Sequence, residues 1–468
     1  MSFVRNSGDP IISHSRFSRG IFGEVFSEAR KKNDRKSDKT IVVKKPANKT
    51  KKNRVVSSVA EWVERSVLTE RKLNQSGVTM TQSITAALPE LVRLHTAAKR
   101  DRQQSFNNLM HFITEPLLEK AYRALNRKAA AGIDGESWKS YGENITLKLQ
   151  QLCQTLHTNS YKPRPVKRHW ILKDNGQQRP IGITCLEDKI VQQALVWILE
   201  SIYENDFLGF SYGFRPQRNQ HQALDAVYMA ISVKKVSWVL DADIQGYFDS
   251  IDHEWMMTFL AHRIADPRIL RILKLTLKAG VMDKGCRFNT VVGTPQGAVI
   301  SPLLGNIYLH YVLDLWIEQW RKRHARGEVY VVRYADDSVF GFQYQSDAQR
   351  LQQALSDRLA TFKLTLNASK THLIEFGRFA ESNRKERGAG KPDTFDFLGF
   401  THICSRRRGD NQFTLLRKTI ASRQRSKLKT IKAELRKRYH DRPIEVGKWL
   451  QKIVQGYFNY YAVPENLT

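Results

Sequence analysis

The chain has 468 residues and a formal net charge of +30 at pH 7, so it can hold two or three domains and favours a polyanionic partner. Its cysteines, Cys153, Cys185, Cys286 and Cys404, form no Cys-x-x-Cys pair, which argues against a zinc site or a disulfide framework and fits a reducing cytosol. We find no signal peptide and no apolar run of about 18 residues, so we expect a cytoplasmic protein without a membrane span.

The positive charge is concentrated in two runs. Residues 30–54 hold twelve Lys or Arg against two Asp, and residues 406–438 hold thirteen against two acidic residues. Such runs are usually solvated tails or faces, but two of them in one basic chain favour contacts with a nucleic-acid backbone. Residues 1–56 lack apolar periodicity and are predicted to be a disordered basic arm.

Helical segments are predicted over residues 57–125, and the glycine-containing run 129–135 is predicted to be a loop. A basic stretch then leads into a β-hairpin that turns near 174–176. Lys173 and Arg179 flank this turn, where two cations could hold a triphosphate. From the residues alone, solvent-facing cations on a hairpin are the simpler interpretation.

A helix with an apolar face is predicted over residues 187–203, and an aromatic and basic loop follows at 210–216. Mixtures of aromatic and cationic side chains can stack on and clamp nucleic acid. Arg215 is therefore the candidate template contact, whereas Phe214 fits core packing equally well.

Two segments far apart in the sequence carry carboxylates. An apolar strand over 237–244 delivers Asp243 near its end, and a turn and a helix with Phe248 follow. The β-type pattern at 329–342 is interrupted by Asp336-Asp337, which predicts a hairpin with the pair at its tip. Phe248 alone could be plain packing.

Together these carboxylates are the ligands that Mg²⁺ prefers, and two such ions can activate a hydroxyl and stabilise a leaving phosphate oxygen. Adjacent Asp residues are also common in turns, because their side chains hydrogen-bond the nearby backbone. Spacing along the chain does not show that the three carboxylates meet, so both interpretations stand.

Further along the chain, the loop 293–297 precedes a helix predicted to start near Ser301. A helix over 346–362 and an apolar strand over 395–400 follow. A basic helix is predicted over 417–440, with buried apolar positions at Ile420, Leu428, Ile431 and Leu435.

In this order the motifs resemble those of bacterial group II intron-encoded reverse transcriptases, the reverse transcriptase/maturase family. Besides Asp243, the matching stretches are GQQRPIGI at 176–183, SYGFRP at 211–216, GTPQG at 293–297, SPLL at 301–304, YADD at 334–337, LNASKT at 366–371 and FDFLGF at 395–400. A lone Tyr-x-Asp-Asp is a weak signal, but this ordered set is specific.

The resemblance implies an α+β right-hand polymerase of fingers, palm and thumb, with an antiparallel palm sheet flanked by helices and a helical thumb. Strand 395–400 is expected to close the palm. The implied domains are a basic arm (1–56), an N-terminal helical extension of the fingers (57–160), fingers (161–235), palm with fingers insertions (236–402), and a basic helical thumb with the start of a truncated maturase domain (403–468).

The implied activity is RNA-directed DNA synthesis for intron mobility, on a structured intron RNA template with a DNA or RNA primer and dNTPs. Catalytic ligands of two Mg²⁺ ions, with Mn²⁺ as a substitute, would be Asp243, Asp336 and Asp337. Nucleotide contacts would come from Lys173, Arg179, Gln296, the sugar-selecting Phe248 and the proton donor Lys370. Template or primer contacts would come from Gly213, Arg215, Arg417, Lys418 and Arg425.

The chain also departs from the family pattern. Gln245 stands where relatives commonly have a basic residue, and Gly305 where they mostly have Ala. We expect neither the rest of the maturase domain nor an endonuclease domain. Three other functions stay open: a maturase-type splicing cofactor that binds intron RNA, a defence- or CRISPR-associated reverse transcriptase, and an inactive truncated relic. The intact carboxylates argue against a relic, whereas the truncation argues for one. The basic thumb favours a maturase, whereas the short C-terminal part argues against it.

Overall fold

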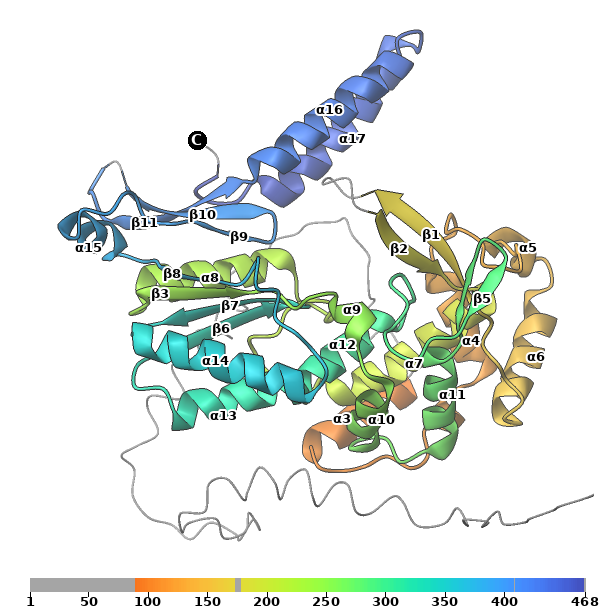
Figure 1. The fold of residues 1–468 in the computed structure, drawn as a ribbon. Helices are drawn as coiled ribbons and strands as arrows, with labels where there is room; N and C mark the ends of the chain where they lie inside the picture. Colours follow the sequence, from red (N-terminus) through yellow and green to blue (C-terminus); the bar gives the residue numbers. More distant parts are fainter. Residues whose placement is uncertain (1–88, 173–177, 408, 467–468) are drawn as a thin grey trace, which may run out of the picture. The chain divides into compact units, whose positions relative to one another are not determined.

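The computed structural model describes residues 89–172, 178–407 and 409–466, whose helices and strands are drawn in Figure 1. The predictions for the arm 1–56 and for Lys173 therefore lie outside the described residues.

A helical layer opens the described part of the chain, with α3 (Pro89–Arg100), the short 3₁₀ turn η2 (Met110–Phe112), α4 (Glu115–Ala124), α5 (Trp138–Gly142) and α6 (Ile145–His157). The Thr114 side chain accepts a hydrogen bond from the Leu117 amide and so caps the start of α4. Both α3 and α4 pack on α7 (Leu186–Tyr203). The predicted helix 187–203 is thus confirmed. Most of α7 is buried around its whole circumference, which makes it the central helix of this region.

The first sheet has the strand order β2 (Gln178–Ile183), β1 (Val166–Leu172), β4 (Val281–Asp283) and β5 (Cys286–Phe288). β1 and β2 pair antiparallel, and Leu172 is the partner of Gln178 next to the turn. The predicted hairpin is thus confirmed on both sides of its turn.

The second sheet has the order β6 (Val329–Tyr334), β7 (Asp337–Phe342), β3 (Trp238–Ala242) and β8 (His372–Glu375), and every neighbouring pair is antiparallel. Figure 1 shows α8 (Gln220–Val233) on one face and α14 (Gln345–Thr361) on the other. This arrangement agrees with the predicted antiparallel sheet flanked by helices and with the predicted helix 346–362.

The alternation of side chains along the strands explains why both faces are covered. Leu240 and Phe340 belong to one apolar cluster together with Leu351 of α14. Their chain neighbours Val239 and Val339 belong to a second cluster, which includes residues of α8. Because successive strand residues point to opposite faces, the sheet contributes to two cores at once.

Helices connect the two sheets. After β3 come α9 (Tyr247–Ser250), α10 (His253–Ala261) and α11 (Pro267–Leu277). α12 (Ser301–Leu309) continues through a π-helical turn, η3 (His310–Asp314), into α13 (Leu315–Arg323). In the described residues, no helix combines the length and the apolarity needed to cross a membrane.

The C-terminal region differs from the sequence prediction. Residues 395–400 do not form one strand of the palm sheet, because positive φ angles of 48° at Leu398 and 86° at Gly399 turn the chain. Instead β9 (Phe395–Phe397), β10 (Phe400–Arg406) and β11 (Phe413–Thr419) form a separate sheet, and α15 (Ala380–Glu386) precedes it. The predicted boundary at 402/403 falls inside β10.

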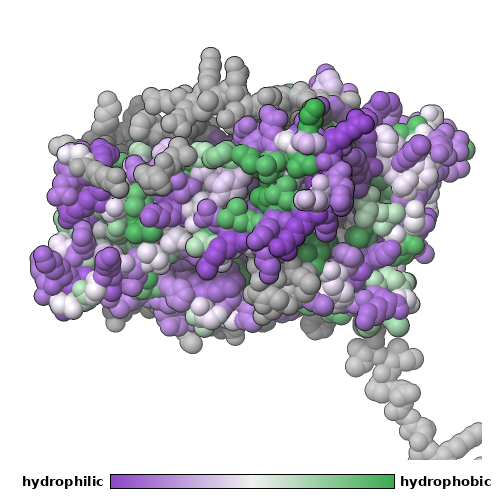
Figure 2. All heavy atoms as spheres, turned by 90° about the horizontal axis from the view of Figure 1, so that it is seen from above, coloured by the Kyte–Doolittle hydropathy of each residue, from purple (hydrophilic) through white to green (hydrophobic). Residues whose placement is uncertain are grey.

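The predicted basic helix 417–440 is shorter than expected. α16 runs over Ala421–Lys437 and is followed by α17 (Pro443–Tyr461), while residues 417–419 belong to β11. Neither helix has a buried residue. Leu428 is 58% exposed, and Ile420, Ile431 and Leu435 are only partly buried, so the predicted burial of these four apolar positions is wrong. The helices leave a surface of mixed character, and Figure 2 shows hydrophilic and hydrophobic residues side by side on the face seen from above.

Candidate active site

Strand pairing brings two distant carboxylates to one place. The last pair between β3 and β7 is Ala242 with Ser338, so the next positions along the two strands are Asp243 and Asp337. Because residues two apart in a strand lie on the same face, both aspartates lie on the face of the sheet that carries Val239 and Val339. The sheet register therefore juxtaposes the two aspartates that spacing along the chain could not connect.

Asp336 lies beside them in the turn between β6 and β7, where Tyr334 pairs with Asp337. The preceding Ala335 has a positive φ of 57°, which is uncommon for a residue with a Cβ atom. The predicted hairpin with the aspartates at its tip is confirmed.

The pKa shifts show how close these charges are. Burial raises the pKa of Asp337 to about 6, and the charges of Asp336 and Asp243 add to the rise. Burial also raises the pKa of Asp336, and the charge of Asp243 acts in the same direction. Three carboxylates that oppose one another's ionisation share one site.

Asp241 is a fourth carboxylate that the sequence prediction missed. Burial raises its pKa to about 7, and the charges of Asp337 and Asp243 contribute to the shift. The signal was present in the sequence: in a strand, the spacing Asp-x-Asp puts Asp241 and Asp243 on the same face.

Two side chains from the loop after α14 bind the carboxylate of Asp243. Asn367 Nδ2 donates to Asp243 Oδ2 over 2.9 Å, and Lys370 Nζ lies 3.3 Å from the same oxygen. The backbone amide of Asn367 also donates to the carbonyl of Asp243, over 2.8 Å. Lys370, predicted as a proton donor, therefore lies at the carboxylate cluster, and Asn367 is a neighbour that the sequence prediction did not include.

The predicted nucleotide contacts Arg179 and Gln296 meet directly. Arg179 Nε donates to Gln296 Oε1 over 2.7 Å, and Gln296 Nε2 donates to Asp249 Oδ2 over 3.1 Å. This row of side chains links β2 to the loop before α12 and to α9. Gly297 allows the loop before α12 to approach β2 closely. Its φ is 106°, and an added Cβ would lie 2.9 Å from the Gly182 carbonyl oxygen.

Phe248 lies half-buried between this row and α12. Its ring centroid is 5.1 Å from that of Tyr247. A Cβ atom added to Gly305 would come within 3.0 Å of the Phe248 ring and 3.2 Å of the Tyr247 ring. The absence of a side chain at Gly305 therefore gives these two rings their room.

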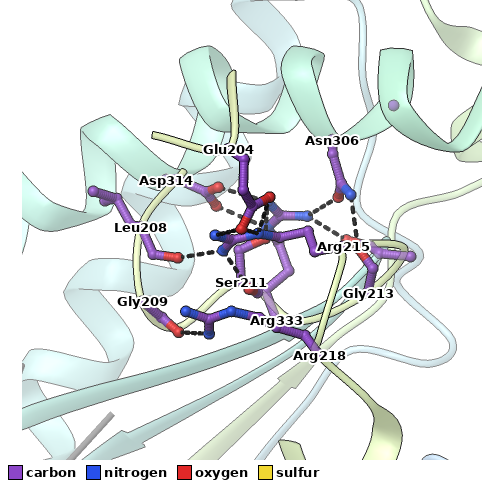
Figure 3. Close-up of polar contacts among 12 residues, drawn as sticks. Glu204, Leu208, Gly209, Ser211, Gly213, Arg215, Arg218, Asn306, Asp314 and Arg333 are labelled. Carbon is purple, nitrogen blue, oxygen red and sulfur yellow. Dashed lines mark hydrogen bonds and ion pairs between the residues drawn. The ribbon is translucent and has the colours of Figure 1, made fainter. Parts of the chain in front are cut away.

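The predicted template contacts divide into exposed and buried side chains. Arg215 is buried: it forms an ion pair with Glu204 and donates to the Leu208 and Ser211 carbonyls, as Figure 3 shows. With these bonds made inside the protein, a template contact through Arg215 is not supported. Its neighbour Phe214 is instead 50% exposed, with its ring 6.3 Å from that of Tyr334.

Three other predicted contacts lie in the C-terminal region. Arg417 is buried and donates to Asp225 and to the Pro464 carbonyl, so a structural role fits it better than binding primer. Lys418 on β11 and Arg425 on α16 are exposed. Gly213, which is also a predicted template contact, packs against the turn between β6 and β7, and a Cβ there would lie 2.3 Å from the Ala335 nitrogen.

The donor set at the site fits a divalent cation. Carboxylate oxygens are hard ligands, and a cation would relieve the repulsion that helps to raise the pKa values of Asp336 and Asp337. Within the described part of the chain, no three acidic, His or Cys side chains converge closely enough to hold an ion unaided. Mg²⁺ in proteins commonly takes one or two carboxylates together with substrate phosphates and water.

Comparison with known proteins gives the family. The chain is 35% identical over 318 residues to Protein YkfC of Escherichia coli K12. The aligned region covers 60% of this chain and 83% of that protein. It is also 35% identical over 241 residues to the group II intron-encoded protein LtrA of Lactococcus lactis, with coverage of 50% and 39%. The match to the putative COX1/OXI3 intron 2 protein of Saccharomyces cerevisiae is 36% over 179 residues, but it covers only 20% of that protein.

Residues 171–402, which include all the carboxylates described above, match the family described as reverse transcriptase (RNA-dependent DNA polymerase). The chain belongs to the reverse transcriptase family, in its group II intron-encoded type.

Proposed function

We propose that the chain extends a primer 3′-hydroxyl on an RNA template with dNTPs, as a group II intron reverse transcriptase. The observation that carries the proposal is the β3–β7 register, which aligns Asp243 with Asp337 beside Asp336. Reverse transcriptases generally use divalent metal ions, and we assign two Mg²⁺ ions to these three carboxylates. When bound, the ions would activate the attacking hydroxyl and stabilise the leaving phosphate oxygen.

The reaction exchanges one phosphorus–oxygen bond for another. The primer 3′-oxygen bonds to the α-phosphorus, the bond from that phosphorus to the bridging oxygen breaks, and pyrophosphate leaves. The hydroxyl proton passes to water, and we assign protonation of the departing pyrophosphate to Lys370. Its ammonium group lies 3.3 Å from Asp243 Oδ2, at one of the carboxylates that we assign to the metal ions.

The nucleotide would lie between Arg179 and Phe248. The guanidinium of Arg179 offers charge-assisted hydrogen bonds to the phosphates, and its bond to Gln296 holds it on the side of the site that faces α9. The half-buried ring of Phe248, which contacts Tyr247 and occupies the space left by Gly305, would exclude a ribose 2′-hydroxyl.

The decisive experiment is extension of a labelled DNA primer on an RNA template with dNTPs and Mg²⁺. Asp336→Asn keeps the side-chain shape but removes the negative charge. Because transition-state charge stabilisation by a single group is worth at least about a hundredfold, we expect a loss of that size or more. Asp357→Asn, at an exposed carboxyl on α14, is the matched control and should extend as wild type does. A silent wild-type chain would refute the proposed activity.

A second candidate, binding of structured intron RNA in support of splicing, is favoured by one observation. The hairpin of α16 and α17 has no buried residue, and α16 carries a row of exposed cations: Arg423, Arg425, Lys427, Lys429, Lys432 and Arg436. Filter binding of intron RNA by an Asp336→Asn chain tests this role separately. Tight binding together with faster splicing would support it, and binding without any effect on splicing would contradict it.

A further inference from the structure

A buried arginine lies directly behind the turn that joins β6 to β7 at Ala335 and Asp336. Arg333 is the last residue but one of β6 and has no exposed surface. Its Nε and Nη2 donate to the two carboxylate oxygens of Asp314, over 2.7 and 2.5 Å. Nη1 donates to Asn306 Oδ1 over 3.0 Å and to the Ala335 carbonyl over 2.9 Å, and Nη2 also donates to Ser211 Oγ over 2.7 Å. All five N–H donors of the guanidinium are therefore satisfied.

One of these bonds ends on the backbone of the turn itself. The acceptor is the carbonyl of Ala335, the residue with a positive φ that immediately precedes Asp336. Such a conformation persists when the surrounding structure holds it in place. Arg333 supplies that support from inside the protein, and Figure 3 shows its side chain among the partners that surround it.

The loop 210–216 supports the turn from a second direction. Its Tyr212 amide donates to the Arg333 carbonyl over 2.8 Å, and Gly213 lies so close that a Cβ would be 2.3 Å from the Ala335 nitrogen. Asn306 Nδ2 donates to the Gly213 carbonyl over 2.7 Å, so Asn306 ties this loop to Arg333. The loop that the sequence suggested as a template contact thus packs as a support for the turn.

The π-helical turn explains how one helix supplies two of the partners. Residues eight apart in a regular α-helix, such as Asn306 and Asp314, are offset by about 80° around the axis, since each residue turns about 100°. A π turn takes up one extra residue, which reduces the offset to roughly 20°. The π turn His310–Asp314 therefore brings both acceptors to the side that faces Arg333.

We propose that Arg333, with Asp314, Asn306 and Ser211, forms a positioning clamp that fixes the Ala335 backbone and so aims Asp336 at the divalent cations. The clamp touches no substrate, so its members are positioning residues. The inference rests on the proposed polymerase function for its kinetic consequence, but the order of the turn and its affinity for metal can be measured without catalysis.

The test compares two buried arginines. Arg333→Lys keeps the charge but offers three donors in place of five, so the turn loses part of its support. Arg263→Lys is the matched control, because Arg263 is also buried, is paired with Asp206 at 3.1 Å and donates to the Asp101 carbonyl, away from the turn. Thermal unfolding of both variants measures the loss that any buried arginine causes.

Two readouts separate positioning from stability. In Arg333→Lys we expect hydrogen–deuterium exchange of a peptide spanning 330–340 to quicken at least tenfold. In the complex with a dideoxy-terminated primer–template and dNTP, which supplies the phosphates without reacting, we expect Mn²⁺ to bind at least fivefold more weakly by electron paramagnetic resonance. Arg263→Lys should change neither by more than twofold at a comparable loss of melting temperature. If Arg333→Lys does not fold, Ser211→Ala removes a single acceptor and should change both readouts in the same direction by a smaller factor.

Kinetics complete the test. The Mg²⁺ concentration for half-maximal primer extension should rise at least fivefold in Arg333→Lys, while the KM for dNTP stays within twofold. Unchanged exchange and unchanged Mn²⁺ affinity would overturn the clamp even if extension fell. A wild type that extends no primer would instead refute the proposed function, and the exchange measurement on the free protein would still decide the clamp.

Discussion

Phe214 and Arg215 are neighbours in the chain, yet they face opposite environments. The backbone at Phe214 has a positive φ of 55°, which turns its ring outward, while the next side chain points into the protein toward Glu204. A sequence with aromatic and basic residues side by side indicates nucleic-acid contact but does not say which of the two is free to make it. The partner Glu204, eleven residues earlier at the end of α7, decides the question.

We therefore predict opposite effects for substitutions at these two positions. Phe214→Ala should weaken binding of a primer–template by tenfold or more, since stacking of a base on an aromatic ring is worth about 1–3 kcal/mol. Its stability should stay within about 0.5 kcal/mol of wild type, because half of the ring is already in solvent. Fluorescence anisotropy with a labelled primer–template and urea unfolding measure the two quantities.

Arg215→Ala is the counterpart, and it should cost roughly 3 kcal/mol of stability because it leaves Glu204 without its ion-pair partner. The affinity of the folded fraction for primer–template should stay near wild type. Equal losses of affinity in both variants would return Arg215 to the template-binding surface.

Among the elements, local patterns predicted what local physics determines. The runs of β-branched and aromatic residues around Asp336-Asp337 are enough to specify a hairpin, and the apolar face of 187–203 is enough to specify α7. The alignment of Asp243 with Asp337 depends on which distant strands pair, and no local pattern carries that information.

The errors have the same origin. The run 395–400 is apolar throughout, but positive φ angles at Leu398 and Gly399 make it two strands in place of one. Arg417 and Lys418 look like the start of a basic helix, but they alternate buried and exposed in β11, because Arg417 finds Asp225 in α8. Apolar periodicity predicts burial of Leu428, because it assumes that a packing partner is present. None of the described elements covers this side chain.

α7 also carries an acidic group whose ionisation costs stability. Glu200 is buried, and burial raises its pKa to about 8, with the charge of Glu204 adding to the shift. In the unfolded chain this carboxyl has an ordinary pKa near 4.3 and is ionised at neutral pH. The folded state therefore holds a proton that the unfolded state lacks. The stability that comes from binding this proton is lost as the pH rises toward 8.

We predict that the free energy of unfolding of Glu200→Gln, measured relative to wild type, is about 2 kcal/mol higher at pH 8 than at pH 6. The reason is that wild type loses about 1.4 kcal/mol for each pH unit below the folded-state pKa. Gln keeps the size of the side chain and never ionises. Urea unfolding at the two pH values measures the difference. For Glu143→Gln, at an exposed carboxyl, the difference in the free energy of unfolding from wild type should not depend on pH. A constant difference for Glu200→Gln as well would mean that Glu200 is ionised throughout this range.

At the scale of the whole molecule, the charge distribution sets how the protein meets a polyanion. The net charge is +30, but much of the cationic surface nearest the C-terminus lies on α16, whose side chains are not buried. Lys427, Lys429 and Lys432 are exposed on this helix, so their cations are available to bind phosphates. The site at Asp243, Asp336 and Asp337 is by contrast a cluster of negative charge, and a primer–template needs cations elsewhere to hold it there.

We predict that neutralising three cations of α16 reduces both the affinity for primer–template and its dependence on salt. In the variant Lys427→Gln, Lys429→Gln and Lys432→Gln, the slope of log affinity against log salt should fall in magnitude by roughly 2, because each lost phosphate contact removes about 0.7–0.9. The control changes the same charge on α3, as Arg93→Gln, Lys99→Gln and Arg100→Gln, all at exposed positions. If both variants flatten the slope equally, the net charge of the protein attracts the nucleic acid and α16 makes no particular contact. If only the α16 variant does so, this helix lies along the phosphate backbone of the bound duplex.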